Sequence, residues 1–471
     1  MRLIILFFSL LIIKLQAIAQ TDPDTAKSEA DSFFIVSKIK IEGNRKTKTY
    51  IILRELNFKE GDTLYKATLK ENFLINHNRL FNTALFVTVD IEADSSDQLT
   101  KDVLIKVKER WYTYPNIIFE LADRNFNEWW EQRGHDINRT NYGIYFDQKN
   151  VRGRNENLKL KIQLGFTKQF EFNYSMPYIN KNQKTGLGFN FAFNTNKQLA
   201  YRTLNHKLEY LNTGEYLRKR IYTGLTISRR EKFYQFHSLN IGFSYNTIAD
   251  TIAKLNPEYF FENEHKQSYF TLRYNFVNDK RDISYYPLRG YYLRVEVEKN
   301  GLTKFEDVNI LAFKFLIERF VEITPKLFFG GAFRQKISFP NRQPYSNYKG
   351  LGYGIEYVSG YELYVIDGRH FSLSKVNFKY KILSKKLELK FIPIRQFNTI
   401  PFSLYLRLYS EGGYVSDNMY HTPNNPLANA FLWGNGAAID FVSYYDFVFR
   451  FEYSFNRLGE SGIFLHVKAP I

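Results

Sequence analysis

A strict two-residue alternation of side chains, repeated in segment after segment from Trp111 to Ile471, constrains this chain more than any other feature. From Leu158 to Phe166 every second residue is apolar, and Lys159, Lys161 and Gln163 lie between the apolar positions. Successive side chains of a strand point to opposite faces, so the pattern predicts strands with one apolar and one polar face. The same alternation is found in residues 270–276, 293–297, 376–382, 404–408, 447–455 and 463–471.

These strands are predicted to form a barrel wall rather than a two-sheet sandwich. Their apolar face is strongly aromatic, their polar face is crowded with lysine, arginine and glutamate, and no second apolar set fills a sandwich core. The 44 Phe and 35 Tyr suit the aromatic girdles of a transmembrane barrel. About 360 residues, at roughly 20 to 24 per strand and connection, predict an all-β transmembrane barrel of about 16 antiparallel strands over residues 111–471.

The N-terminus has the pattern of a cleavable signal peptide. An apolar run from Leu3 to Ile13 follows Arg2, and Ala17-Ile18-Ala19 offers a small-residue cleavage pattern, so residues 1–19 are expected to be removed. The run is far shorter than the roughly 20 residues that cross a bilayer as a helix. No other stretch is long enough, so insertion into a membrane would require strands. Residues 20–34 are predicted to be a polar linker.

Residues 35–110 are predicted to form a small α+β domain. Alternation predicts strands at residues 37–43, 85–91 and 102–109, and helical patterns cover residues 49–56 and 61–81. The expected order is β-α-α-β-β.

Composition and motifs exclude several classes of function. The absence of cysteine excludes disulfides, thiolate metal centres and a cysteine nucleophile. The net charge of +17 is spread between apolar residues, which favours an anionic lipid surface over nucleic acid as the partner. No catalytic or phosphate-binding motif is present, so we expect no enzymatic activity, cofactor or metal site. Solvated or lumen-facing positions are expected for the eight histidines, which are His77, His135, His206, His237, His265, His370, His421 and His466.

Two turn motifs of the predicted α+β domain carry a family resemblance. Ile41-Glu42-Gly43-Asn44 lies in its first turn, and Leu80-Phe81-Asn82-Thr83 leads to Phe86 before its second strand. With the element order, these residues resemble a POTRA domain across residues 35–110. The resemblance implies a periplasmic domain whose sheet edge takes up extended segments of client or partner proteins.

The stretch Gly354 to Gly368, GIEYVSGYELYVIDG, is rich in aromatic residues and glycines. Composition alone also allows an ordinary hairpin loop. Val358-Ser359-Gly360-Tyr361, followed by Asp367-Gly368, resembles the lumen-inserted loop of the BamA/TamA-type outer-membrane assembly factor superfamily. The family core is Val-Arg-Gly-Phe or Val-Arg-Gly-Tyr, so Ser359 stands at the arginine position. The resemblance implies that this loop lies inside the barrel.

Residues 409–413 resemble the family's Phe-x-Asp-x-Gly motif of the barrel wall, with Tyr409, Glu411 and Gly413 at the three defined positions. In the family, the aspartate of this motif holds the loop arginine. Because Ser359 carries no charge, we expect Glu411 to pair with another inward-facing cation. Arg281 and Arg450 are the leading candidates and Arg369 is the third. A Glu411 that is simply hydrated is the alternative.

A further resemblance to the family is the hairpin Asp279-Lys280-Arg281 with Tyr286 to Gly290. Continued alternation from Phe270 turns Arg273, Asp279 and Arg281 toward the lumen. These residues are expected to be either ordinary pore-lining charges or anchors of the lumen loop.

The resemblance implies an outer-membrane protein that inserts or translocates polypeptides. Its partners would be unfolded or extended clients, outer-membrane lipid and accessory periplasmic proteins. In the family the first and last barrel strands pair weakly; here the candidates are Asn116 to Leu121 and Gly462 to Ile471, and an unpaired edge attracts other strands. A passive or substrate-selective outer-membrane pore is the alternative. General assembly, dedicated secretion and a lipid-linked role all remain open.

Overall fold

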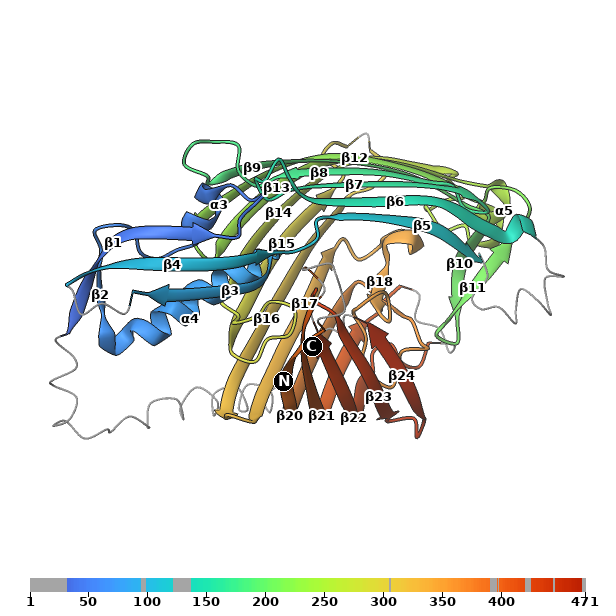
Figure 1. Cartoon of the computed structure of the whole chain (residues 1–471). Helices are drawn as coiled ribbons and strands as arrows, with labels where there is room; N and C mark the ends of the chain where they lie inside the picture. Colours follow the sequence, from blue (N-terminus) through green and yellow to red (C-terminus); the bar gives the residue numbers. More distant parts are fainter. Residues whose placement is uncertain are drawn as a thin grey trace.

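The computed structural model describes residues 32–94, 99–121, 137–304, 306–389, 396, 398–419, 425–443 and 445–467. The predicted signal peptide and most of the predicted linker lie outside these residues. Figure 1 shows a small α+β domain beside a large curved sheet. This arrangement confirms the predicted fold class, an α+β domain followed by an antiparallel barrel sheet.

The N-terminal domain has one four-stranded sheet in the order β2-β1-β4-β3, with β1 and β4 parallel. Its elements are β1 (Phe33–Glu42), α3 (Thr49–Leu53), β2 (Thr63–Tyr65), α4 (Lys66–Asn82), β3 (Phe86–Ala93) and β4 (Thr100–Glu109). Side chains buried between sheet and helices form its core, including Ile52, Leu80, Phe86, Val103 and Ile105.

The helix predicted to begin at Gly61 begins only at Lys66, so that prediction was wrong at its start. Residues 63–65 form β2 instead, because they pair antiparallel with residues 33–35 of β1 and bury Leu64 in the core. The helix predicted over residues 49–56 likewise ends at Leu53. The observed order is therefore β-α-β-α-β-β.

Strand β3 is an edge of this small sheet, and its backbone alternation gives a test of client capture. The Asp94 N–H donates to the Asp102 carbonyl at 2.9 Å, so the N–H groups of Glu92 and Asp90 also face β4 and that of Ala93 faces outward. We expect Ala93→Pro to weaken capture of extended clients while the domain stays folded. Glu92→Pro is the control, because it removes a ladder hydrogen bond and should unfold the domain. Crosslinking to clients at the parental level in Ala93→Pro would contradict capture at this edge.

The large sheet contains sixteen strands, each antiparallel to its neighbours, which confirms the predicted number. In chain order they are β5 (Thr113–Leu121), β6 (Thr140–Val151), β7 (Glu156–Gly165), β8 (Gln169–Met176), β9 (Thr185–Asn196), β12 (Arg218–Lys232), β13 (Gln235–Ile248), β14 (Lys266–Asp279), β15 (Gly290–Asn300), β16 (Ile310–Thr324), β17 (Leu327–Phe339), β20 (His370–Glu388), β21 (Thr399–Ser416), β22 (Phe431–Ser443), β23 (Val448–Asn456) and β24 (Ser461–Val467).

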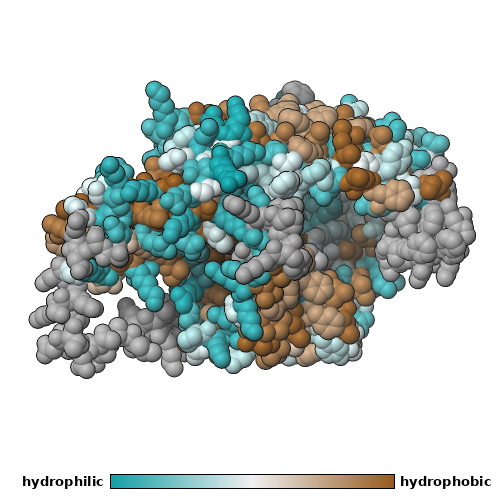
Figure 2. All heavy atoms as spheres, in the orientation of Figure 1, coloured by the Kyte–Doolittle hydropathy of each residue, from teal (hydrophilic) through white to brown (hydrophobic). Residues whose placement is uncertain are grey.

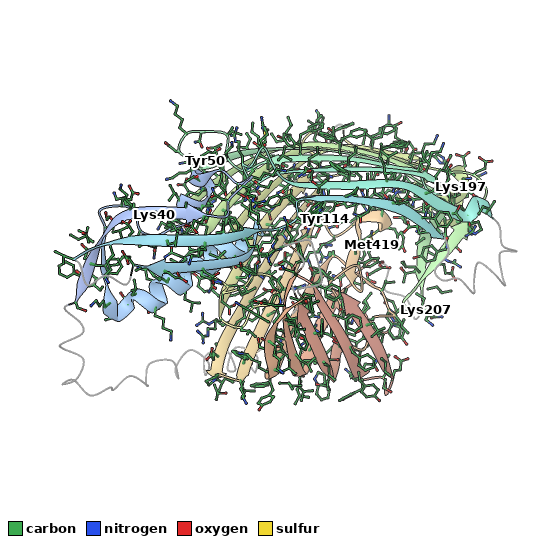
Figure 3. The ribbon with its side chains drawn as sticks, viewed as in Figure 1. Lys40, Tyr50, Tyr114, Lys197, Lys207 and Met419 are labelled. Atoms are coloured by element: carbon green, nitrogen blue, oxygen red, sulfur yellow. The ribbon has the colours of Figure 1, made fainter. Side chains whose placement is uncertain are left out.

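Short elements lie in the connections between these strands. They are the 3₁₀ turns η3 (Ile137–Arg139) and η4 (Tyr345–Asn347), the hairpin β10 (Gln198–Leu204) and β11 (Lys207–Asn212), helix α5 (Asp250–Leu255), and the pair β18 (Lys349–Leu351) and β19 (Ile366–Asp367). Figure 3 places Lys40 on the N-terminal domain. Lys197, which precedes β10, and Lys207, the first residue of β11, lie toward the other end of the molecule.

The two faces of the large sheet differ as the alternation predicts. In β20, Val376, Phe378 and Tyr380 are exposed on the outer face, whereas the intervening Asn377 and Lys379 are buried on the inner face. Brown, apolar surface gathers over β20–β24 in Figure 2. No helix in the described part of the chain is long and apolar enough to cross a membrane.

Among the described residues the large sheet does not close on itself. β5 and β24 are its two ends, and neither is paired on its outer side. Figure 1 shows β5 in the upper layer and β24 in the lower layer, and the same view in Figure 2 is hollowed between them. The predicted last strand runs from Ser461 as far as the description extends, to Val467.

Candidate functional site

The connection between β17 and β20, residues 340–369, folds back against the inner face of the sheet; we call it the lumen loop. Val358, Tyr361 and Ile366 of this loop are almost fully buried. They pack in one apolar cluster with inward-facing side chains of three strands, Phe371 and Leu373 of β20, Val415 of β21 and Leu432 of β22. The loop thus fills part of the lumen, as the resemblance implied.

Glu411 of β21 is the polar centre of this contact. Its Oε2 accepts a hydrogen bond from the Ser359 backbone N–H at 2.9 Å and lies 3.0 Å from Lys375 Nζ. Its Oε1 lies 3.6 Å from a guanidinium nitrogen of Arg407. All three charged side chains are at most 3% exposed. The expected pairing of Glu411 with an inward cation is confirmed, and Ser359, which stands at the family's arginine position in sequence, contacts Glu411 through its backbone amide.

The cations that pair with Glu411 are not the predicted ones, so the choice of Arg281, Arg450 and Arg369 was wrong. Lys375 lies directly opposite Glu411 in the β20–β21 ladder. Arg407 precedes Glu411 by four residues, so both lie on the inner face of β21. The outward positions of Leu406 and Leu408 could have indicated Arg407 from the sequence. Lys375 could not be found that way, because its contact depends on the register between two strands.

Three glycines let the loop backbone approach the wall. A Cβ at Gly434 would lie 1.8 Å from the Ser359 carbonyl oxygen, and one at Gly413 would lie 2.6 Å from a methyl group of Val358. Gly360 has φ of +87°, a conformation that side-chain-bearing residues rarely adopt. The Gly360 carbonyl accepts a hydrogen bond from Asn456 Nδ2 of β23 at 2.7 Å. Gly413 of the predicted wall motif therefore has a steric role that the spacing alone did not show.

Two family profiles match the chain. The profile described as the Omp85 superfamily domain matches residues 150–370, and the POTRA profile, described as surface antigen variable number repeat, matches residues 34–110. The chain therefore carries a POTRA domain and an Omp85 superfamily domain.

Solved structures resemble this chain at low sequence identity. BamA from Haemophilus ducreyi lacking POTRA domains 1–3 is 14% identical, with 92% of this chain and 83% of that chain covered and a TM-score of 0.51. CdiB from Escherichia coli is 11% identical, with 96% and 92% covered and a TM-score of 0.49. The likeness to BamA supports the fold. A search of curated protein sequences finds no match.

Two of the remaining predicted cations, Arg281 and Arg450, pair with carboxylates other than Glu411. Arg281 makes a bidentate contact with Asp279, at 2.8 and 2.7 Å, and lies 3.4 Å from Glu318. Arg450 Nε lies 2.7 Å from Asp440, which also accepts a hydrogen bond from Tyr286.

Other predicted residues lie around the lumen loop. Arg369 donates to Asn341, and Asp367 accepts from Tyr353 within the loop itself. A Cβ at Gly368 would lie 2.3 Å from Val415. The ring of Tyr409 lies under the Arg407 guanidinium, 4.5 Å from its centre. The predicted motif residues therefore surround the loop, and Glu411 joins loop and wall through charge. A second ion pair between loop and wall is formed by Glu356 and Arg334 of β17, at 3.3 Å.

The β10–β11 hairpin holds the lumen loop from a second direction. The His206 carbonyl accepts a hydrogen bond from the Val365 N–H at 2.8 Å, and Thr203 contacts the Tyr345 hydroxyl at 2.9 Å. His206 Nε2 also accepts from the Leu427 N–H at 3.1 Å. Burial lowers the pKa of His206, which favours the neutral ring that such a contact needs.

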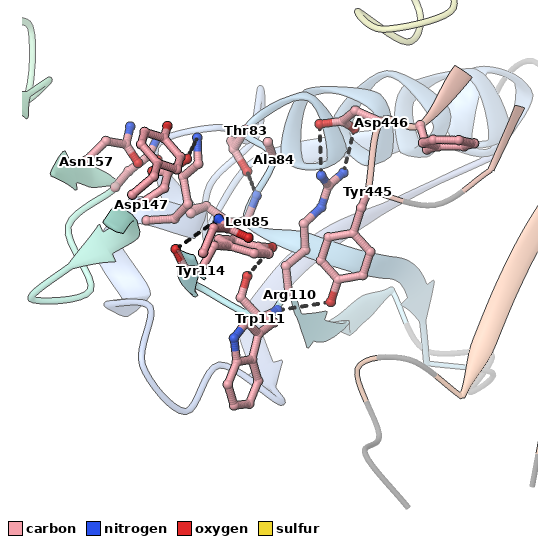
Figure 4. A pocket seen from close by; sticks show the side chains of 15 residues that line it. Thr83, Ala84, Leu85, Arg110, Trp111, Tyr114, Asp147, Asn157, Tyr445 and Asp446 are labelled. Atoms are coloured by element: carbon pink, nitrogen blue, oxygen red, sulfur yellow. Dashed lines mark hydrogen bonds and ion pairs between the residues drawn. The ribbon is translucent and has the colours of Figure 1, made fainter. Parts of the chain in front are cut away.

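The joint between the POTRA domain and the barrel is built from paired charges. Arg110 donates to both carboxylate oxygens of Asp446 at 3.0 Å, beside a cavity of about 590 Å³ whose lining includes Trp111 and Tyr114 (Figure 4). On the other side Arg230 of β12 donates to both oxygens of Glu55 at 2.6 and 2.7 Å.

A stacked arginine adds to this joint. The Arg79 guanidinium of α4 lies 3.2 Å from the centre of the Phe233 ring in the β12–β13 turn. Burial lowers the pKa of Arg79 to about 10. Sequence reasoning missed the joint, because its residues are far apart in the chain and their charges look like those of an ordinary surface.

One histidine lies in a group that sequence spacing did not reveal. His466 of β24 is brought together with Glu362 of the lumen loop and Glu452 of β23. The three residues come from separate elements, so their spacing in the chain carries no sign of the contact. His466 faces the lumen, as expected, and the structure adds its contact with two carboxylates.

Proposed function

We propose that this protein resides in the outer membrane and inserts or translocates polypeptides without enzymatic chemistry. The observation that supports this most directly is that β5 and β24, the ends of the sixteen-stranded sheet, each have a free edge with no paired strand among the described residues. A free edge offers a row of unpaired N–H and C=O groups, and an extended segment of another chain can join it with little sequence preference.

The side chains along both edges suit a strand that enters lipid. Ile117 and Phe119 of β5 are 88% and 73% exposed, and Ile463 and Leu465 of β24 are each 62% exposed. An arriving strand with alternating character would place its own apolar residues beside these side chains and its polar residues toward the lumen. The POTRA edge β3 offers a separate place to hold an extended client before it reaches the barrel.

Site-specific photocrosslinking tests this proposal. A photoreactive residue at Phe119 or Ile463 should capture polypeptide clients in cells, because both positions lie on free edges. The same residue at Phe378, also exposed on the outer face but in the interior of the sheet, is the control and should capture none. Equal labelling at all three positions, or none at the edges, would contradict an edge-templating role.

Depletion of the protein distinguishes the roles that this proposal includes from the alternative. Loss of many outer-membrane barrels would indicate general assembly, and loss of one exported client would indicate dedicated translocation. Loss of solute uptake alone would indicate a pore. If the protein is a pore that the lumen loop obstructs, deleting residues 354–368 should change its single-channel conductance. Conductance that is unaffected by the deletion would count against a plug role for the loop.

A further inference from the structure

Three potential metal ligands from three different elements meet at the inner face beside the open edge. They are Glu362 of the lumen loop, Glu452 of β23 and His466 of β24, and one ligand atom from each lies within 4.8 Å of the others. Glu452 and His466 sit on neighbouring strands of the ladder, and the loop carries Glu362 to them. A single ion could therefore contact all three after small side-chain movements.

Each of the three residues has a ligand atom that makes no hydrogen bond within the described part of the chain. These atoms are Glu362 Oε1, Glu452 Oε1 and His466 Nε2, and Glu452 is only 1% exposed. Buried polar atoms are nearly always satisfied, since leaving one without a partner costs about 1–3 kcal/mol. Three such atoms, on residues whose ligand atoms lie within 4.8 Å of one another, indicate a ligand of positive charge.

Tyr357 orients the imidazole. Its hydroxyl lies 3.5 Å from His466 Nδ1, and the two rings stack with centres 5.9 Å apart at an angle of 17°. With Nδ1 turned to Tyr357, Nε2 is the nitrogen that faces the carboxylates. A ligand histidine is commonly held this way, by a contact at its other ring nitrogen.

The carboxylates around this group are not all paired with cations. Glu411 and Glu452 share the two cations Lys375 and Arg407, with Arg407 3.5 Å from Glu452. Glu362 instead accepts only the Gly360 N–H, at 2.7 Å, and forms no ion pair with a described residue. Arg450 lies opposite His466 in the ladder but pairs with Asp440 at 2.7 Å, so Glu362 is the carboxylate of this group that has no cation within ion-pair distance among the described residues.

We propose that Glu362, Glu452 and His466 bind a divalent transition-metal ion, for which Zn²⁺ is the best match. One imidazole and two carboxylates form a mixed nitrogen and oxygen ligand set that Zn²⁺ accepts, and water would complete the coordination. The ion joins the lumen loop to the last two strands. It therefore sets how firmly β24, a free edge of the sheet, is held to the loop.

Metal titration of the full chain, purified in detergent and stripped with a chelator, tests the proposal. Co²⁺ should give visible d–d absorption bands at one ion per chain, and Zn²⁺ should displace it. Glu362→Gln and His466→Gln should each abolish the bands. Tyr357→Phe should weaken Co²⁺ binding by about tenfold, because it acts through the imidazole. His265→Gln is the matched control, since His265 also lies beside a carboxylate, Asp250 at 3.3 Å, but on the surface.

The outcomes separate a metal site from a proton shared between the carboxylates. Absence of Co²⁺ bands in the parent, or bands that persist in both ligand variants, overturns the proposal. A protonated carboxyl vibration in the infrared that disappears in Glu362→Gln and does not respond to Zn²⁺ also overturns it. Heat-modifiable migration on gels checks that each variant is folded; if His466→Gln is not, Glu362→Gln decides, because it changes only a loop residue.

Discussion

Replacing Glu411 with glutamine is expected to release the lumen loop from the barrel wall. The substitution removes the one carboxylate that holds both Lys375 and the Ser359 amide, and it leaves buried Lys375 without an anion. Removing one partner of a buried ion pair typically costs about 3–5 kcal/mol. We expect the wall, the loop or both to rearrange so that Lys375 reaches water, which exposes residues 354–368.

The release can be followed by chemical labelling because the chain has no cysteine. Ser359→Cys supplies a reporter thiol, because cysteine is nearly the size of serine and leaves the backbone N–H in place. Ser359 is 2% exposed in the parent protein, so the thiol should be protected there. Its reaction with a maleimide should be at least about tenfold faster in Glu411→Gln, since every 1.4 kcal/mol is tenfold in an equilibrium. Protease cleavage within residues 354–368 should rise in parallel.

Two further variants make this experiment specific. Glu298→Gln is the matched control, because Glu298 is an inward carboxylate paired with Arg273 at 2.7 Å on strands that do not contact the loop motif. The double variant Lys375→Met with Glu411→Gln should recover part of the protection, because neither charge is then left alone. Reporter labelling at the parental rate in Glu411→Gln would show that the apolar cluster alone holds the loop.

Replacing Glu55 with glutamine is expected to undock the POTRA domain from the barrel. Glu55 is 3% exposed and receives both guanidinium nitrogens of Arg230, whose side chain is 11% exposed. Without the carboxylate, a buried guanidinium remains in the joint beside Arg54 and Arg79, and this arrangement should cost about 3–5 kcal/mol of docking free energy.

Hydrogen exchange reports this undocking at a single amide. The Lys48 N–H of the POTRA domain donates to the Gly153 carbonyl of the barrel at 2.9 Å, so it is protected only while the two parts are docked. Its exchange should be about 100-fold faster in Glu55→Gln, as a loss of roughly 3 kcal/mol requires. Glu92→Gln removes an exposed pair with Lys106 and should change exchange little. Unchanged exchange at Lys48 in Glu55→Gln would show that the joint does not depend on this charge pair.

Register between strands explains why the partners of Glu411 escaped prediction while its need for a partner did not. That Glu411 faces inward follows from the outward Leu406 and Leu408, which is a property of one strand. That Lys375 faces Glu411 depends on how β20 and β21 slide against each other, and no local pattern fixes this at one residue. The same limit applies to Glu362, Glu452 and His466.

By itself, the sequence determined which residues face lipid and which face the lumen, the number of barrel strands and the presence of an α+β domain before them. These are local properties, because the two-residue period is set by backbone geometry within each strand. Only the tertiary structure decided that residues 63–65 form β2, that Glu55 meets Arg230 across the joint, and that the Ser359 amide donates to Glu411. Each of these depends on contacts between distant segments, where burial and pairing outweigh local preference.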